Sequence, residues 1–240
     1  MKFLERCKEF VMHPHVPYFL IEGVRKVSPA AARFLAYGRY NPNTKKYWDQ
    51  KYEEYRVSDA QEQEDERRYA TLRQGIIDRI PQGARLLDVG CGSGRFMELL
   101  RAQKQCTCTG LDISQVAVDL SVRKGFTAFR TELPNIPAEL PSAGFDVITT
   151  VEVLEHISDP DAVIKALTRL VKPGGLLIVG VPEGCMSPDE VDEHVSEFDG
   201  PKLRGMFESG FSVVNEQHVT TTGHTYLVMT GKRKTMAAAA

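Results

Sequence analysis

The chain has 240 residues, of which 42% are apolar and 26% charged, a balance typical of globular proteins rather than disordered ones. Thirty Lys and Arg residues against 32 Asp and Glu residues give a net charge of −2, so binding of nucleic acid through bulk positive charge is not expected. The length allows one α/β domain with at most a small appendage.

Cysteine usage and the apolar stretches favour a cytoplasmic protein. The five cysteines are odd in number and form no recurring CxxC pair, so we expect neither a disulfide framework nor a structural zinc site. The best apolar stretch, 10–21, contains two prolines and is too short to span a bilayer. The first residues lack the apolar core of a signal peptide, and we expect a reducing compartment.

The first part of the chain predicts a helical extension over residues 1–44. Apolar side chains recur at helical spacing over 2–12, and this stripe ends at Pro14. The stripe fits a helix packed on the main domain or on a partner subunit, which leaves a homodimer open, and a membrane-surface helix is the alternative. Residues 59–80 predict a largely solvated helix with one buried edge, stopped by Pro81.

From residue 84 onward, short apolar strands alternate with helices, which predicts a parallel sheet with helices on both faces. The last two strands lie close together in the sequence, so an antiparallel pair at the sheet edge is expected. The predicted strands are 85–89, 106–111, 126–130, 145–150, 175–181, 211–218 and 225–230. The predicted helices are 93–104, 115–124, 160–171 and 200–209.

The turn after the first of these strands carries the strongest functional signal. Gly90, Gly92 and Gly94 form GxGxG, and Arg95 stands where the dinucleotide fingerprint has its third glycine. Asp88 would repel a pyrophosphate but suits a cationic ligand. These two departures disfavour an NAD-dependent oxidoreductase. Glycines at a helix start let a ligand approach the backbone closely.

Asp112 ends the second predicted strand, 24 residues after Asp88. An acid at this place can accept both hydroxyls of a ribose, whereas the alternative is an N-cap for the following helix. The two segments together predict a nucleoside that carries a cationic, amino-acid-bearing group. S-adenosylmethionine fits this description.

The chain resembles the class I S-adenosylmethionine-dependent methyltransferases, in particular small-molecule enzymes of the type 11-like branch. Four segments carry the resemblance in the correct order: 88–94, 111–114, 145–156 and 170–175. The resemblance implies a Rossmann-like doubly wound sheet of seven strands with the last antiparallel. It covers 45–232 as the methyltransferase domain, after the 1–44 extension and before a tail at 233–240.

The resemblance also implies where the cofactor would bind. The glycine loop would hold the methionine part, Asp112 the ribose and the Glu132–Leu133 region the adenine. Many relatives carry an Asp where this chain has Thr131. Tyr47 and Trp48 resemble an aromatic pair of the family that either closes over the cofactor or packs in the core. The expected cofactor-binding residues are Tyr47, Asp88, Gly90, Gly92, Gly94, Asp112, Ile113, Glu132, Leu133 and Val151.

His156 and His194 are the candidate catalytic residues. The sulfonium leaves as a neutral thioether, so the protein needs no acid, but a hydroxyl acceptor is helped by a general base. His156 follows the fourth predicted strand, and His194 lies after the fifth, in a segment that often walls the substrate pocket. Each could instead be a packing residue. The prediction is methyl transfer to a small molecule, at an oxygen.

The spacing E-x-x-E-H offers a metal-dependent alternative. Glu152, Glu155, His156 and His194 could together present two carboxylates and two imidazoles to a divalent cation. This arrangement resembles two branches of the family, the ubiquinone-pathway O-methyltransferases and the small-RNA 2′-O-methyltransferases. The same spacing also occurs in members that use no metal. A non-catalytic cofactor-binding subunit is the remaining alternative.

Overall fold

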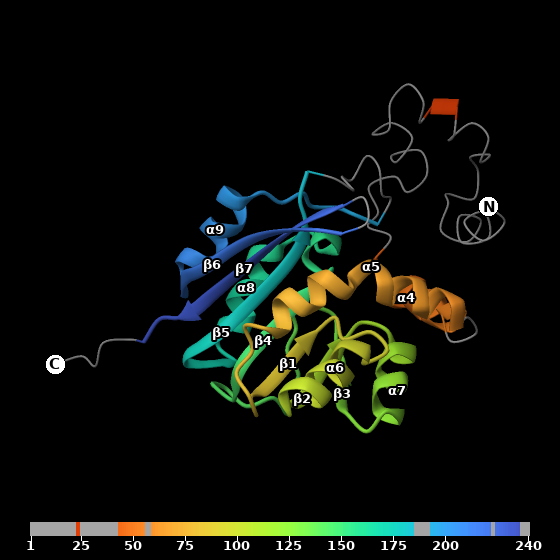
Figure 1. Ribbon diagram of the computed structural model, residues 1–240, viewed down its shortest axis with the longest axis horizontal. Coiled ribbons are helices and arrows are strands. Elements are labelled where there is room, and N and C mark those ends of the chain that lie inside the picture. Colours follow the sequence, from red (N-terminus) through yellow and green to blue (C-terminus); the bar gives the residue numbers. More distant parts are fainter. Residues whose placement is uncertain (1–22, 25–42, 56–58, 185–192, 222–223, 236–240) are drawn as a thin grey trace.

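The computed structural model describes residues 23–24, 43–55, 59–184, 193–221 and 224–235 (Figure 1). The predicted extension at 1–44 lies almost entirely outside the described residues, as does most of the tail at 233–240. Among the helices described, no stretch combines the length and apolar character that a membrane crossing requires.

The sheet has seven strands, as predicted, and their order is β3-β2-β1-β4-β5-β7-β6. The pairs among β1 to β5 are parallel, whereas β7 is antiparallel to both β5 and β6. The strands are β1 Arg85–Val89, β2 Thr107–Asp112, β3 Thr127–Arg130, β4 Phe145–Val151, β5 Val171–Pro182, β6 Phe211–Thr220 and β7 Thr225–Arg233. The strand order reverses between β1 and β4, which is where ligands bind in open α/β sheets.

Helices cover both faces of this sheet (Figure 1). Buried side chains of α5 and α6 pack on one face, and those of α8 and α9 pack on the other. The helices are α4 Lys45–Tyr55, α5 Asp59–Ile77, α6 Arg95–Lys104, α7 Gln115–Arg123, α8 Pro160–Thr168 and α9 Gly200–Glu208, with a short 3₁₀ turn, η1, at Leu154–His156. Asp159 and Asp199 cap α8 and α9, and each is followed within two residues by a proline.

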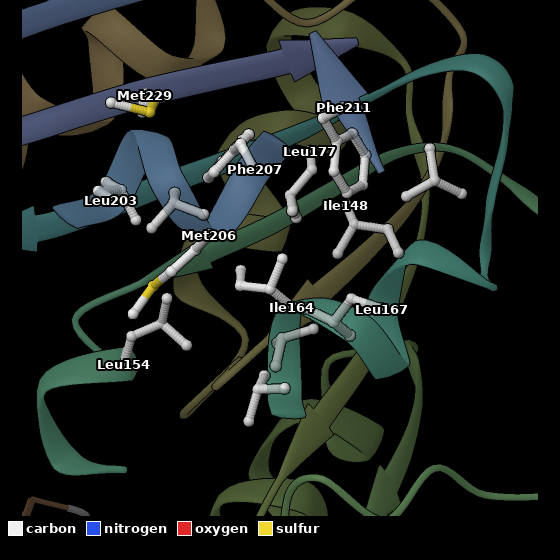
Figure 2. Close-up of a cluster of buried hydrophobic side chains, with 14 of the residues drawn as sticks. Ile148, Leu154, Ile164, Leu167, Leu177, Leu203, Met206, Phe207, Phe211 and Met229 are labelled. Atoms are coloured by element: carbon white, nitrogen blue, oxygen red, sulfur yellow. The ribbon is translucent and has the colours of Figure 1, made fainter. Parts of the chain in front are cut away.

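A cluster of apolar side chains between the sheet and helices α8 and α9 fixes the place of η1 (Figure 2). Leu154 of η1 is fully buried in this cluster with Met206 of α9. The core therefore anchors the 3₁₀ turn through Leu154. The last two residues of the turn, Glu155 and His156, belong to the site described next.

Several predicted boundaries differ from the structure, among them the start of α6 and the junction between α8 and β5. Helix α6 begins at Arg95 and not at residue 93, because Gly94 has a φ of 81°, outside the helical region. The predicted helix over 160–171 ends at Thr168, and β5 begins at Val171 instead of 175. A register shift between Phe145 and Val147 accommodates the additional residues of β5.

Candidate functional site

A cavity of about 340 Å³ opens at the carboxyl ends of β1, β2 and β4, next to the point where the strand order reverses. Segments far apart in the sequence contribute to its wall. The lining residues are Asn43, Trp48, Tyr52, Val89, Gly90, Leu111, Asp112, Ile113, Thr131, Glu132, Leu133, Pro134, Glu152, Val153, His156, Ile157, Ser158 and Asp159.

The glycine loop can adopt its path only without side chains. Gly90 has a φ of 76°, and a Cβ atom there would lie 2.2 Å from a methyl carbon of Val153. A Cβ at Gly92 would lie 2.8 Å from the hydroxyl oxygen of Tyr52. Gly90 lines the cavity, so a ligand can approach the backbone there, whereas Gly92 and Gly94 lie outside the lining and shape the turn.

Asp112 lies in the cavity wall, as expected of a residue that accepts ribose hydroxyls. Its carboxylate oxygens accept hydrogen bonds from the backbone N–H groups of Gly92 and Ser114, each at 2.9 Å, which fixes its orientation. Burial raises the pKa of Asp112 to about 6. The N-cap of α7 is Ser114, whose hydroxyl accepts from Ala117, so the capping alternative does not describe Asp112.

Asp88 does not line the cavity. It is buried beneath the glycine loop, where its carboxyl group accepts a hydrogen bond of 2.7 Å from the Thr149 hydroxyl. Burial raises the pKa of Asp88 to about 7. The side chain therefore ties β1 to β4. Val151, another predicted cofactor residue, also lies outside the lining, with its methyl carbon 3.2 Å from where a Cβ of Gly180 would be.

The residues predicted to flank the adenine lie together in the cavity wall. Ile113, Glu132 and Leu133 all line the cavity, together with Thr131. The backbone N–H of Thr131 donates to the carbonyl of Asp112 at 2.8 Å, and its hydroxyl donates to the carbonyl of Asn135 at 2.6 Å. The loop after β3 is thus held directly against the residue expected to meet the ribose.

Helix α4 supplies one wall of the cavity, and its contribution differs from the prediction. Trp48 and Tyr52 line the cavity, whereas the buried Tyr47 turns away and donates its hydroxyl hydrogen to Glu193. Trp48 and Tyr52 are four residues apart and therefore share one face of the helix. This spacing was the available signal for Tyr52, which the sequence reasoning missed.

Interactions on both sides hold α4 in place. On the cofactor side, Asp49 accepts a 2.7 Å hydrogen bond from the Ser114 hydroxyl at the start of α7. On the other side, Lys51 contacts the Glu193 carboxylate at 2.5 Å, and Asn43 donates to the Glu193 carbonyl at 2.7 Å. Burial alone would raise the pKa of Glu193, but Lys51 and Tyr47 hold it down to about 2.

The two predicted histidines lie next to each other, with only His156 in the cavity wall. The centroids of their rings are 5.0 Å apart. The ring centroid of Trp48, on α4, also lies 5.0 Å from that of His156. His156 Nδ1 lies 3.1 Å from the Glu193 carbonyl, which can only accept, so Nδ1 carries the proton and Nε2 keeps its lone pair. Burial lowers the pKa of His156 to about 4, which keeps the ring neutral. His156 lines the cavity, whereas the buried His194 lies behind it.

Glu155 completes a group of three potential metal ligands. Ligand atoms of Glu155, His156 and His194 all lie within 4.8 Å of one another. Glu155 is fully buried, and among the described residues no N–H or O–H group is within hydrogen-bonding geometry of its carboxylate oxygens. Burial, reinforced by the neighbouring charge of Glu152, raises the pKa of Glu155 well above its usual range.

Glu152 neighbours Glu155 but is not one of these three potential ligands. It lines the cavity, and one of its carboxylate oxygens accepts a hydrogen bond of 3.3 Å from the Tyr69 hydroxyl. Its backbone has a φ of 58°, in the left-handed region that residues other than glycine seldom adopt. The structure thus brings together three of the four residues of the predicted metal set.

Comparison with known proteins identifies the family. A family model described as a methyltransferase domain matches residues 60–219. A ubiquinone biosynthesis O-methyltransferase of Paracidovorax citrulli is 39% identical over 112 residues, which cover 43% of this chain and 47% of that protein. A protein of the same name from Bordetella avium is 38% identical over 99 residues, covering 39% and 41%. The chain thus spans less than half the length of these curated relatives.

Solved structures confirm the fold. A chain from the complex between the Haloferax volcanii Trm112 methyltransferase activator and a methyltransferase matches with a TM-score of 0.67 and 16% identity, over 78% of this chain and 98% of that one. Magnesium protoporphyrin IX methyltransferase from Synechocystis, solved with bound S-adenosylhomocysteine, matches with a TM-score of 0.63 and 16% identity, over 79% and 98%. Since the family model spans more than half of the chain, the protein belongs to the class I S-adenosylmethionine-dependent methyltransferases.

Proposed function

We propose that this protein transfers the methyl group of S-adenosylmethionine to an oxygen atom of a small-molecule acceptor. The observation that carries the proposal is one cavity lined by both Asp112 and His156, one residue for the ribose and one beside the acceptor. The ubiquinone biosynthesis O-methyltransferases among the relatives support an oxygen acceptor. The net charge of −2 and the unpaired thiols of Cys91, Cys106 and Cys108 support a small molecule and a reducing, cytoplasmic setting.

The residues of the cavity fit the cofactor. Gly90 leaves room for a ligand against the backbone, Asp112 presents carboxylate oxygens to ribose hydroxyls, and Glu132 and Leu133 flank the adenine position. When bound, S-adenosylmethionine supplies an activated methyl group. Helix α4 covers the cavity with Trp48, excludes water and holds the reacting groups in line.

His156 is the proposed proton acceptor. Its Nε2 keeps a lone pair because Nδ1 donates to the Glu193 carbonyl. Lys51 and Tyr47 of α4 bind the Glu193 side chain. Glu193 therefore contacts both His156 and helix α4. With a pKa of about 4 the imidazole is a weak base at neutral pH, which suits an acceptor hydroxyl that is already acidic or is acidified in the site.

Binding of the demethylated cofactor tests this proposal. Titration calorimetry with S-adenosylhomocysteine should show binding to the wild type, and Asp112→Ala should weaken it by about tenfold or more, since the hydrogen bonds to a charged carboxylate are lost. Asp119→Asn, at an exposed position of α7, is the matched control and should leave the affinity unchanged. A wild-type protein that does not bind S-adenosylhomocysteine refutes the proposed function.

A divalent metal at Glu155, His156 and His194 is a second candidate feature of the same reaction. The specific observation is the buried Glu155 carboxylate, which has no hydrogen-bond partner among the residues that the structure describes and lies next to two imidazoles. This mixed oxygen and nitrogen donor set suits a transition metal or zinc. The metal would supply a Lewis acid that acidifies the acceptor hydroxyl.

Chelation and a conservative substitution test the metal. Dialysis against a chelator should abolish methyl transfer, and adding back a divalent cation should restore it. Glu155→Gln should bind the metal about tenfold or more weakly while it still binds S-adenosylhomocysteine. Full activity after chelation would leave His156 as a general base acting without a metal.

A further inference from the structure

The acid predicted to face the cationic end of the cofactor is not in the cavity. Asp88 was the candidate, but its carboxyl group is buried below the loop and bonded to Thr149. Glu152 is the carboxylate that lines the cavity on that side. It is adjacent to Val153, whose methyl group packs within van der Waals distance of Gly90 in the glycine loop. Glu152 is thus the acid next to the part of the loop that would hold the methionine group.

The conformation of Glu152 indicates that its position is imposed. A left-handed φ of 58° costs about 1 kcal/mol or more for a residue other than glycine and persists only where the surroundings require it. The backbone N–H of Glu152 donates to the Gly180 carbonyl at 3.0 Å, which fixes the turn to β5. Such strained residues collect at binding sites, where they aim a particular group.

Tyr69 of α5 holds the side chain of Glu152. Its hydroxyl donates to Oε2 of Glu152, while Oε1 is buried and has no hydrogen-bond partner within the described residues. The Tyr69 ring packs edge-on against Tyr226 of β7, with centroids 6.1 Å apart. The guanidinium groups of Arg68 and Arg73 lie 5.5 and 5.6 Å from the Tyr69 ring centroid. These contacts fix the ring and hence the direction of its hydroxyl.

We infer that Glu152 binds the cationic methionyl end of S-adenosylmethionine and that Tyr69 is its positioning residue. The inference rests on the proposed function, since it assigns a further contact to the same cofactor. Arg68 already lowers the electrostatic cost of the Glu152 charge, but Oε1 is buried without a hydrogen-bond donor within the described residues, and a ligand ammonium or sulfonium would complete its surroundings. The second oxygen is held by Tyr69, so the first has a defined direction.

The comparison of two ligands tests this inference. Calorimetry is performed with S-adenosylmethionine, which carries both a sulfonium and an ammonium, and with S-adenosylhomocysteine, which carries only the ammonium. Glu152→Gln keeps the shape of the side chain and removes its charge. We expect it to weaken the binding of both ligands by about tenfold or more if the ammonium is the partner, or of S-adenosylmethionine alone if the sulfonium is.

Tyr69→Phe provides the independent second variant. It should weaken the binding of the same ligand or ligands as Glu152→Gln does, but only by about threefold, because one hydrogen bond to Glu152 is lost. In kinetics the loss should appear as a raised KM for S-adenosylmethionine with little change in kcat. Glu208→Gln, at an exposed position of α9, is the matched control for Glu152→Gln. It should leave both affinities unchanged.

The outcomes separate the inference from the proposed function. Wild-type protein that binds neither ligand refutes the proposed function itself. Wild-type binding with unchanged affinities in Glu152→Gln overturns the inference alone. Unchanged affinities combined with a lost response to metal would also overturn it and would assign Glu152 to the group formed by Glu155, His156 and His194.

Discussion

The two sides of the cavity are built on different physical principles. On the proposed cofactor side, two carboxyl groups already have hydrogen-bond partners: the oxygens of Asp112 accept backbone N–H groups, and Asp88 accepts the Thr149 hydroxyl. On the acceptor side, the Glu155 carboxylate is buried with no donor in the described structure, beside His156 and His194. Asp112 and Asp88 are therefore held by hydrogen bonds within the protein, whereas the Glu155 carboxylate would need a bound group to satisfy it.

This difference predicts how substitutions act. A buried polar group without a partner costs free energy in the empty protein, and a ligand that satisfies it recovers this cost. Changes on the acceptor side should therefore affect turnover far more than folding or cofactor affinity. Changes on the cofactor side should affect cofactor binding, and changes beneath it should affect stability.

The largest effect is expected at the two imidazoles. His156→Ala and His194→Ala should each lower kcat by about 100-fold or more, because the proton acceptor or the ligand set is lost. The affinity for S-adenosylhomocysteine should change little. His218→Ala, at an exposed position paired with Glu183, is the control. An equal loss of cofactor affinity in His156→Ala and His194→Ala would break the division between the two sides.

An intermediate effect is expected where α4 joins both sides. Glu193→Gln removes the charge that Lys51 and Tyr47 contact, and so loosens α4. We expect KM to rise by about three- to tenfold for both cofactor and acceptor. Trp48 is the single tryptophan of the chain and lines the cavity, so its fluorescence can follow the helix directly.

The pH dependence of the Glu193 contribution sharpens this prediction. Its pKa is about 2 in the folded protein against an ordinary value of 4.5, so the stabilisation is present above about pH 4.5 and is lost as the pH falls toward 2. Urea unfolding of the wild type should show this loss. In Glu193→Gln the loss should be smaller. Equal acid sensitivity of the two proteins would contradict the assigned role of Glu193.

The smallest effect is expected beneath the glycine loop. The pKa of Asp88 is about 7 in the folded protein against an ordinary value of 3.8, so its contribution to stability is full below about pH 3.8 and falls as the pH rises through 7. Asp88→Asn keeps an acceptor for Thr149 without a buried charge. It should be more stable than the wild type at pH 8, by about 1 kcal/mol or more in urea unfolding, and the gain should vanish near pH 4.

The cofactor side could be predicted from sequence because each of its parts is local. Gly90 and Asp112 stand directly at strand ends, and a short motif therefore fixes their geometry. Glu132 and Leu133 follow the next strand in the same way. For these residues, the turn at the end of the strand determines where the side chain or backbone lies, and contacts with distant segments change that place little.

The remaining residues depend on pairing and packing that no local pattern encodes. Asp88 was expected to face a ligand, but the register of β1 with β4 places it opposite Thr149, which takes up its carboxyl group. Tyr47 was predicted to bind the cofactor, yet Glu193, 146 residues later, draws its hydroxyl away and leaves Trp48 in the wall. Tyr69 of α5 gave no signal at all, because its partner Glu152 is 83 residues distant.

Helix α4 has a consequence for how the cavity wall can vary. The family model begins at residue 60, after the eleven-residue helix that supplies Trp48 and Tyr52 to the cavity. The part of the cavity wall that α4 supplies therefore lies outside the part of the chain that the family model matches. A change in α4 would alter this wall and leave every strand of the sheet untouched, so the wall and the sheet can vary independently.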